Sequence, residues 1–168
     1  KKKNIFIRIS WYFLNELILK NSFFIWQWPK VILLKTFGAK IGKGLVLKPS
    51  VNIKFPWNLI IGSNCWIGEN VWIDNLDKVT IYDNVCLSQG SMLLCGNHNF
   101  KKSTFDLITD EIILKDGVWV GAKSIVCPGV TLEINSVLAV NSVASRNLVK
   151  NGIYRGNPAV LLSYRKIS

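Results

Sequence analysis

Starting at Leu114, the sequence reads LKDGVW, VGAKSI, VCPGVT, LEINSV and LAVNSV, which are five consecutive units of six residues. Each unit opens with an aliphatic residue, and its fifth position holds Val or Ser. A period of six matches neither the period of about 3.6 of a helix nor the period of about two of an amphipathic strand. It is typical of a parallel β-helix, in which each hexapeptide forms one short side of a triangular coil. We therefore expect the aliphatic residue to point inward and the small residue to fill the space near a corner.

The same repeat extends towards the N-terminus. Further units open at Ile41, Leu47, Ile53, Ile61, Ile67, Ile73, Ile81, Leu87 and Leu93. The steps of six, six and eight give coils of twenty residues, with the two extra residues near Trp57-Asn58 and Asp77-Lys78, which predicts a bulged corner. After Leu114 the coils shorten to eighteen residues. The sequence thus predicts an all-β solenoid of about five coils, enough to bury a narrow core.

Three segments follow from this pattern. Residues 1–37 are predicted to be helical, with a break at Trp28-Pro29. Residues 38–145 form the β-helix, from which residues 97–112 depart as an excursion loop. Loops of that length inside a compact domain are usually functional. Residues 146–168 are expected to leave the solenoid as a short terminal helix or tail.

The positive charge is concentrated in the N-terminal third. Residues 1–54 hold eleven Lys or Arg and one acid, a net charge of +10, whereas residues 55–168 hold ten Lys or Arg and nine acids, a net charge of +1. The basic residues alternate with bulky apolar ones, and no nucleic-acid-binding motif is present, so nucleic acid is not the expected partner. A membrane surface explains the mixture better.

Residues 1–37 also hold nine of the nineteen aromatic residues. No uncharged run reaches the roughly 18 residues of a membrane span. Two interpretations remain open and are compatible. The segment is a helical cap over the open end of the solenoid, or a peripheral anchor that places Trp and Phe at the lipid headgroups.

The four cysteines (Cys65, Cys86, Cys95 and Cys127) show no Cys-x-x-Cys spacing, and Cys65 occupies a small inward position. We interpret all four as packing residues in a reducing compartment, the cytoplasm. Lys1–Lys3 are basic, but no small-residue cleavage site follows an apolar core, so no signal peptide is expected. The first residue is not Met, which suggests a start upstream.

His98 is the only histidine, and it lies at the beginning of the excursion loop. Imidazole is the side chain whose ordinary pKa lies near neutrality, so it suits a general base. A loop that leaves a rigid solenoid is also where a cleft forms. The alternative is a loop histidine with no chemical role.

The ordered combination of these features resembles the hexapeptide-repeat acyltransferases. Within them it is most similar to the sugar O-acetyltransferases, and in particular to the colanic-acid or exopolysaccharide type. The resemblance covers residues 41–160 and rests on the repeats, on Cys95-Gly-Asn-His98 before the excursion, on Asp116-Gly-Val-Trp-Val-Gly121, and on Gly156-Asn-Pro-Ala159. The basic helical segment ahead of Gly38-Ala-Lys-Ile-Gly is similar to the colanic-acid type.

This resemblance implies a left-handed β-helix, which is an exception to the right-handed crossover rule, and a homotrimer with active sites between subunits. It implies acetyl-CoA as co-substrate, no metal, and His98 as the general base that removes the proton from a sugar hydroxyl of a surface polysaccharide or its lipid-linked precursor. Acetyl transfer would be direct, with a backbone N–H as oxyanion donor.

The resemblance also implies binding residues. Those for CoA are Trp119, Gly121, Ala122, Ala139, Arg155, Asn157 and Pro158, with Lys150 as an alternative cation for a phosphate. Trp119 is equally compatible with a subunit contact, the small residues with tight coils, and Asn157-Pro158 with a simple turn. Asn75 and Asp77, on the corner one coil below His98, are candidates for sugar binding or for orienting the imidazole, or else for a β-turn.

Three other functions are compatible with parts of this pattern. The γ-type carbonic anhydrases share the repeat but need three histidine ligands for zinc, and one histidine per chain cannot supply them. An acyltransferase that uses another donor, such as an acyl-carrier protein, would keep the solenoid and His98, although the Gly-Asn-Pro-Ala segment favours CoA. A non-catalytic, membrane-associated scaffold remains the alternative of a different class.

Overall fold

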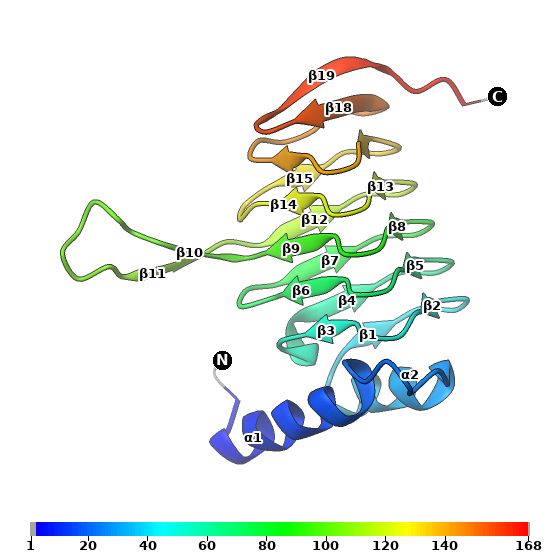
Figure 1. Cartoon of the computed structure of the whole chain (residues 1–168), viewed down its shortest axis with the longest axis vertical. Coiled ribbons are helices and arrows are strands. Elements are labelled where there is room, and N and C mark those ends of the chain that lie inside the picture. Colours follow the sequence, from blue (N-terminus) through cyan, green and yellow to red (C-terminus); the bar gives the residue numbers. More distant parts are fainter. Residues whose placement is uncertain (1–2, 168) are drawn as a thin grey trace.

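The protein is a triangular parallel β-solenoid closed at one end by two helices (Figure 1). The computed structural model describes residues 3–167, so Lys1, Lys2 and Ser168, which belong to the predicted N-terminal segment and tail, lie outside the described residues. Each coil places one short strand on each of three faces, and the strands of consecutive coils pair in parallel on each face. This architecture confirms the predicted solenoid.

The three faces are defined by their strands. Face I contains β1 (Lys40–Ile41), β4 (Leu59–Ile61), β7 (Val79–Ile81), β12 (Ile112–Leu114) and β15 (Thr131–Leu132). Face II contains β2 (Val46–Leu47), β5 (Trp66–Ile67), β8 (Cys86–Leu87), β13 (Trp119–Val120), β16 (Val137–Leu138), β18 (Gly152–Gly156) and β19 (Ala159–Tyr164). Face III contains β3 (Asn52–Ile53), β6 (Trp72–Asp74), β9 (Met92–Leu94), β14 (Ile125–Val126) and β17 (Val143–Ala144).

The inward residues stack in three columns, with the register that the repeat predicts. On face I, Ile61 pairs with Ile81, Ile81 with Leu114, and Leu114 with Leu132. The aliphatic residues that open the units are buried, apart from Ile41 at the helical end. The fifth positions are buried as well, at Val118, Ser124, Val130, Ser136 and Ser142. The core is therefore a stack of apolar layers, each covered by its neighbours.

Corners depend on left-handed backbone conformations. Asn64 and Asn84 have φ of 56° and 58°, and Gly44 and Gly117 have φ of 68° and 69° at the equivalent corner. Asparagine and glycine tolerate this conformation better than other residues, which explains their recurrence there. The two extra residues of the first coil fall in a short 3-10 helix, η2 (Pro56–Asn58), at the corner where the spacing predicts a bulge.

The N-terminal helices cover the first coil. α1 (Ile5–Leu14) continues as the π-helical turn η1 (Asn15–Leu19), and α2 (Gln27–Thr36) follows after a non-helical connection. The predicted break at Trp28-Pro29 is wrong: Pro29 lies in the first turn of α2, where a missing N–H costs nothing. The buried Trp11 donates from Nε1 to the Ile53 carbonyl at 2.9 Å, and Gln27 accepts from the Leu47 N–H at 3.1 Å. Residues 3–37 therefore act as a cap.

In the part of the chain that the structure describes, no helix combines the length and apolarity needed to cross a bilayer.

The excursion is a two-stranded hairpin, formed by β10 (Gly96–His98) and β11 (Leu107–Thr109). At the C-terminus, the alternative of a terminal helix is wrong, because β18 and β19 form antiparallel strands. β18 also extends face II in parallel, and Leu148 and Tyr154 continue the inward columns of faces I and II. The solenoid thus has about six turns and not the predicted five. The repeat pattern misses the last turn because Tyr154 occupies a position where the other units have an aliphatic residue.

Truncation of one buried column residue tests this core. Ile67→Ala removes a side chain with 0% exposure, and we expect it to lower the free energy of unfolding by about 2–5 kcal/mol. The matched control, Ile32→Ala, truncates a side chain that is 56% exposed and should change stability by no more than about 0.5 kcal/mol. Urea denaturation at one fixed protein concentration measures both, and equal effects would contradict the assigned core.

Candidate active site

The β10–β11 hairpin carries His98 on its first strand. Gly96 lies opposite Thr109 and His98 opposite Leu107 in an antiparallel pair. The hairpin begins just after β9, separated from it only by the buried Cys95. In Figure 1 it projects sideways from the solenoid at the level of β9. The single histidine therefore stands on a short arm whose root is fixed in the core.

One residue, Phe105, holds the His98 ring. The Nδ1 atom of His98 lies 2.8 Å from the Phe105 carbonyl oxygen. Because a carbonyl oxygen only accepts, Nδ1 carries the proton in the neutral imidazole, and Nε2 keeps its lone pair. The two rings also stack, with centroids 4.5 Å apart and planes 8° apart. These contacts fix both the tautomer and the orientation that a general base needs.

Phe105 itself has a left-handed backbone, with φ of 48°. Such a conformation is rare for a bulky residue and costs on the order of 1–3 kcal/mol. The turn around it is closed by hydrogen bonds from the Phe105 N–H to the Lys102 carbonyl at 3.1 Å and from the Asn99 N–H to the Asp106 carbonyl at 2.8 Å. Strain of this kind is concentrated at functional sites. Here it aims the carbonyl that orients His98.

The corner of the coil below supports the root of the hairpin. Asp77 Oδ2 accepts a hydrogen bond from Thr109 Oγ1 at 3.2 Å, and its Oδ1 accepts from the Lys78 N–H at 2.7 Å. Asn75 is fully buried, and its amide bonds to both backbone groups of Phe55, at 2.9 Å and 2.6 Å. Asp77 therefore remains beside the candidate site. The prediction that Asn75 binds a sugar is wrong, because its side chain is buried and its amide atoms bond to the backbone of the neighbouring coil.

A groove of about 610 Å³ lies at the corner that follows β8, β13 and β16. Its lining includes four of the predicted CoA-binding residues: Trp119, Gly121, Ala122 and Ala139. These residues come from two adjacent coils, and the parallel register aligns them, with Trp119 opposite Val137 and Val120 opposite Leu138. The structure thus brings together residues that the sequence separates by up to twenty positions.

The groove has an aromatic edge and a floor of close-packed backbone. Trp119 donates from Nε1 to Ser88 Oγ at 2.9 Å, which holds the indole along the coils. At Gly121, an added Cβ would lie 2.7 Å from the Leu138 oxygen and the Val140 nitrogen. Only glycine permits this approach of two coils. A long, thin ligand could therefore lie against main chain here.

No family model matches the chain. The "Putative colanic acid biosynthesis acetyltransferase" of Escherichia coli is 34% identical over 141 residues, which are 84% of this chain and 77% of that protein. The galactoside O-acetyltransferase of Escherichia coli is 28% identical over 129 residues, 75% of this chain and 64% of that protein. The chain belongs to the hexapeptide-repeat acetyltransferase family.

Solved structures agree with the family assignment. A hexapeptide-repeat acetyltransferase from Vibrio cholerae, in complex with acetyl coenzyme A, superimposes with a TM-score of 0.86 at 22% identity, over 96% of this chain and 88% of that chain. A galactoside acetyltransferase in complex with coenzyme A gives 0.84 at 24% identity, over 94% and 80%. The solenoid is the left-handed β-helix of these acetyltransferases, as the resemblance implied.

Three of the residues predicted to bind CoA do not line the groove beside Trp119. Arg155 is on β18, and Asn157 and Pro158 form the exposed turn before β19. Lys150 is also exposed, in the turn before β18. The groove instead includes Arg165, whose Nη1 donates to the Gly117 carbonyl at 3.1 Å. The sequence carries no signal for Arg165, because only the antiparallel return of β19 brings it back to the groove.

The cysteines of this acetyltransferase are poorly suited to nucleophilic catalysis. Burial raises the pKa of the Cys95 thiol to about 12, and burial also raises the pKa of Cys65, Cys86 and Cys127. A raised pKa keeps a thiol protonated near neutral pH, and the thiolate is the nucleophilic form. All four are free, and residues 3–167 contain no cluster of three His, Cys, Asp or Glu side chains that could hold a metal ion.

The hairpin and the groove face different directions on one chain. The hairpin leaves face III after β9, whereas the groove opens at the corner that follows β8 and β13. Figure 1 shows the hairpin and these two strands at opposite sides of the solenoid. A single chain therefore does not present its His98 to its own groove.

Proposed function

We propose that the protein is an acetyl-CoA-dependent O-acetyltransferase that acts on a sugar hydroxyl of a surface polysaccharide or its lipid-linked precursor. The observation that carries the proposal is the His98–Phe105 contact, because it places the proton of the neutral imidazole on Nδ1 and leaves Nε2 as the acceptor. Family membership supplies the reaction class, and the names of the relatives supply the sugar.

His98 acts as the general base in this mechanism. Nε2 takes the proton of the acceptor hydroxyl while the hydroxyl oxygen attacks the thioester carbonyl of acetyl-CoA. The tetrahedral intermediate collapses, the C–S bond breaks, and the leaving thiolate takes the proton back from His98. A backbone N–H near the cleft stabilises the oxyanion. The acetyl group moves directly to oxygen, so no covalent enzyme intermediate is required, and much of the acceleration comes from holding the two substrates together.

The groove beside Trp119 is the proposed CoA site. Its floor at Gly121, Ala122 and Ala139 suits the thin pantetheine arm, and its volume lies within the range of about 300–1,000 Å³ for cofactor sites. Arg165 is positioned to meet a phosphate with a charge-assisted hydrogen bond. Two relatives in solved structures bind acetyl-CoA or CoA, which supports the same donor here.

A homotrimer completes the proposed site. The hairpin of one subunit would extend His98 over the CoA groove of its neighbour, because one chain keeps the two apart. The exposed apolar side chains of the hairpin, Phe100, Phe105, Leu107 and Ile108, favour such a contact. Asp77, tied to the hairpin root through Thr109, is the proposed acceptor-side residue.

The N-terminal segment is the proposed membrane contact, at the cytoplasmic face. Besides its capping role, it exposes large apolar side chains: Phe6, Ile9, Phe13, Leu17, Phe23, Ile25, Trp26, Trp28 and Ile32. Aromatic residues beside basic ones favour an anionic lipid surface. A non-catalytic membrane-associated scaffold would share this surface, and an acyltransferase with another donor would share His98, so acetyl-CoA turnover separates the three.

Removal of the imidazole should abolish most turnover. We expect His98→Ala to lower the rate of CoA release from acetyl-CoA by about two to four orders of magnitude, with CoA affinity unchanged. The assay runs over a panel of sugars and lipid-linked glycans, with CoA affinity measured by calorimetry. Lys101→Ala, on the same hairpin, is the control and should retain wild-type turnover. Wild-type turnover in His98→Ala would refute general-base catalysis, and no turnover or CoA binding in the wild type would favour the scaffold.

Trp119 should contribute to CoA affinity. We expect Trp119→Ala to raise the Kd for CoA by up to roughly tenfold, because an aromatic contact with a ligand contributes about 0.5–1.5 kcal/mol. The matched control is Trp66→Ala, since Trp66 occupies the same outward register on face II with similar exposure, 44% against 48%, and lies outside the groove. Equal effects of the two substitutions would contradict the assigned donor site.

The exposed aromatics should control membrane binding. We expect a Phe23→Ser/Trp26→Ser double variant to bind phosphatidylglycerol vesicles at least about tenfold more weakly than the wild type in co-sedimentation. The control pair, Val160→Ser/Leu162→Ser, removes exposed apolar side chains at the other end of the solenoid. Equal sedimentation of all three proteins would exclude the N-terminal segment as the membrane contact.

A further inference from the structure

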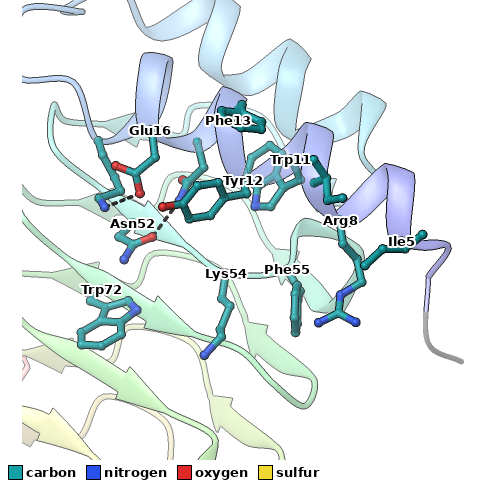
Figure 2. Close-up of a pocket in the computed structure, with 13 residues that line it drawn as sticks. Ile5, Arg8, Trp11, Tyr12, Phe13, Glu16, Asn52, Lys54, Phe55 and Trp72 are labelled. Atoms are coloured by element: carbon teal, nitrogen blue, oxygen red, sulfur yellow. Dashed lines mark hydrogen bonds and ion pairs between the residues drawn. The ribbon is translucent and has the colours of Figure 1, made fainter.

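A second groove, of about 760 Å³, runs along one side of the contact between the N-terminal helix and the first two coils. Figure 2 shows its two walls, one from α1 and one from face III. The helix contributes Ile5, Ile9, Tyr12 and Phe13, and the solenoid contributes Phe55 and Trp72. The proposed acetyl transfer at His98 uses none of these residues.

The groove carries positive charge at one position without a paired carboxylate. Lys54 is paired with Asp74 at 2.8 Å, and Lys20 is paired with Glu16. The Arg8 guanidinium instead lies over the Phe55 ring, 5.6 Å from its centroid, and among residues 3–167 no carboxylate lies within ion-pair distance of it. In Figure 2 the charged ends of Arg8 and Lys54 flank the Phe55 ring. The groove is thus lined mainly by apolar side chains and is cationic beside Phe55, and the rest of its lining includes the polar residues Asn15, Glu16, Lys20 and Asn52.

We propose that this groove binds the phosphate and the adjoining isoprenoid units of a polyprenyl-phosphate lipid that carries the sugar acceptor. The inference rests on the proposed function, since it names the class of acceptor. An apolar chain matches the walls, and a guanidinium recognises phosphate through planar, charge-assisted hydrogen bonds. The volume suits a headgroup and a few isoprenoid units, and the remaining chain would stay in the membrane beside the exposed aromatics.

The position of the groove relative to His98 supports this assignment. Trp72 lines the groove and pairs with Met92 on β9, one coil higher on face III. Adjacent coils are about 4.8 Å apart, and the hairpin begins just after β9. A phosphate held at the groove would therefore place the attached sugars on the face from which the His98 arm projects.

The charge of the N-terminal third favours an anionic lipid over a second copy of the chain as the ligand of this groove. The N-terminal third has a net charge of +10, so the same surface of another copy would repel it rather than neutralise Arg8. An anionic lipid neutralises it. A flat bilayer surface would contact the outer side of α1 but would not fill the space between α1 and face III.

Binding of farnesyl phosphate to the 168-residue chain, measured by calorimetry below the micelle concentration and without vesicles, tests the proposal. We expect the wild type to bind farnesyl phosphate at least about tenfold more tightly than farnesol or inorganic phosphate. Arg8→Gln should weaken binding by about tenfold or more, because a hydrogen bond between charged groups is lost. Arg8→Lys should restore part of the affinity, and Arg146→Gln, an exposed arginine in the C-terminal segment, should bind as the wild type does.

Two results would overturn the inference. Equal affinity of wild type and Arg8→Gln, or of farnesol and farnesyl phosphate, would show that the groove does not select a phosphate. A change in oligomeric state of Arg8→Gln by light scattering, with no binding of farnesyl phosphate to the wild type, would show that another subunit covers the groove.

The same variants separate this inference from the proposed function. Transfer of acetyl to a soluble sugar without any binding of farnesyl phosphate would leave the function intact and refute the lipid site. Arg8-dependent binding of farnesyl phosphate without turnover of any acceptor would support the lipid site and refute the proposed catalysis.

Discussion

Every coil of this protein buries its inward side chains only against the coils above and below it. A single coil has no interior of its own, so the three columns of aliphatic residues must stay in register from the first coil to the last. Face III illustrates the constraint, with Ile53, Ile73, Leu93, Val126 and Ala144 paired in sequence. The ends of the columns need covers, which Trp11 and the helices provide at one end and β18–β19 at the other.

This constraint also explains where function can be inserted. The hairpin leaves the solenoid after Cys95, and the chain returns in time for β12 to pair with β7, so that Leu114 lies above Ile81. The columns continue through the insertion, and the hairpin root is tied to the coil below by Thr109 and Asp77. Only the hairpin tip is free of the register. There the strained Phe105 orients His98, in a place where strain cannot disturb the core.

The two grooves differ in their lining, and each lining matches the chemistry of its proposed ligand. The groove beside Trp119 is formed by coil corners whose backbones approach closely at Gly121, and it suits an extended cofactor arm. The groove beneath α1 is formed by side chains of a helix and a sheet, and its apolar walls with Arg8 suit an amphiphilic anion. The regular solenoid thus forms the proposed donor site, and its irregular cap forms the proposed acceptor surface.

The sequence by itself determined the solenoid, the inward columns, the excursion and the family. A six-residue period records which side chains face the core, and the parallel register then aligns Trp119, Gly121, Ala122 and Ala139 without further information. It did not determine the sixth turn, where Tyr154 breaks the aliphatic pattern, or the burial of Asn75 against Phe55. Arg165 and the Arg8 groove were decided by tertiary structure alone. Both depend on a segment that folds back onto the solenoid, and no local spacing in the chain encodes the direction of that return.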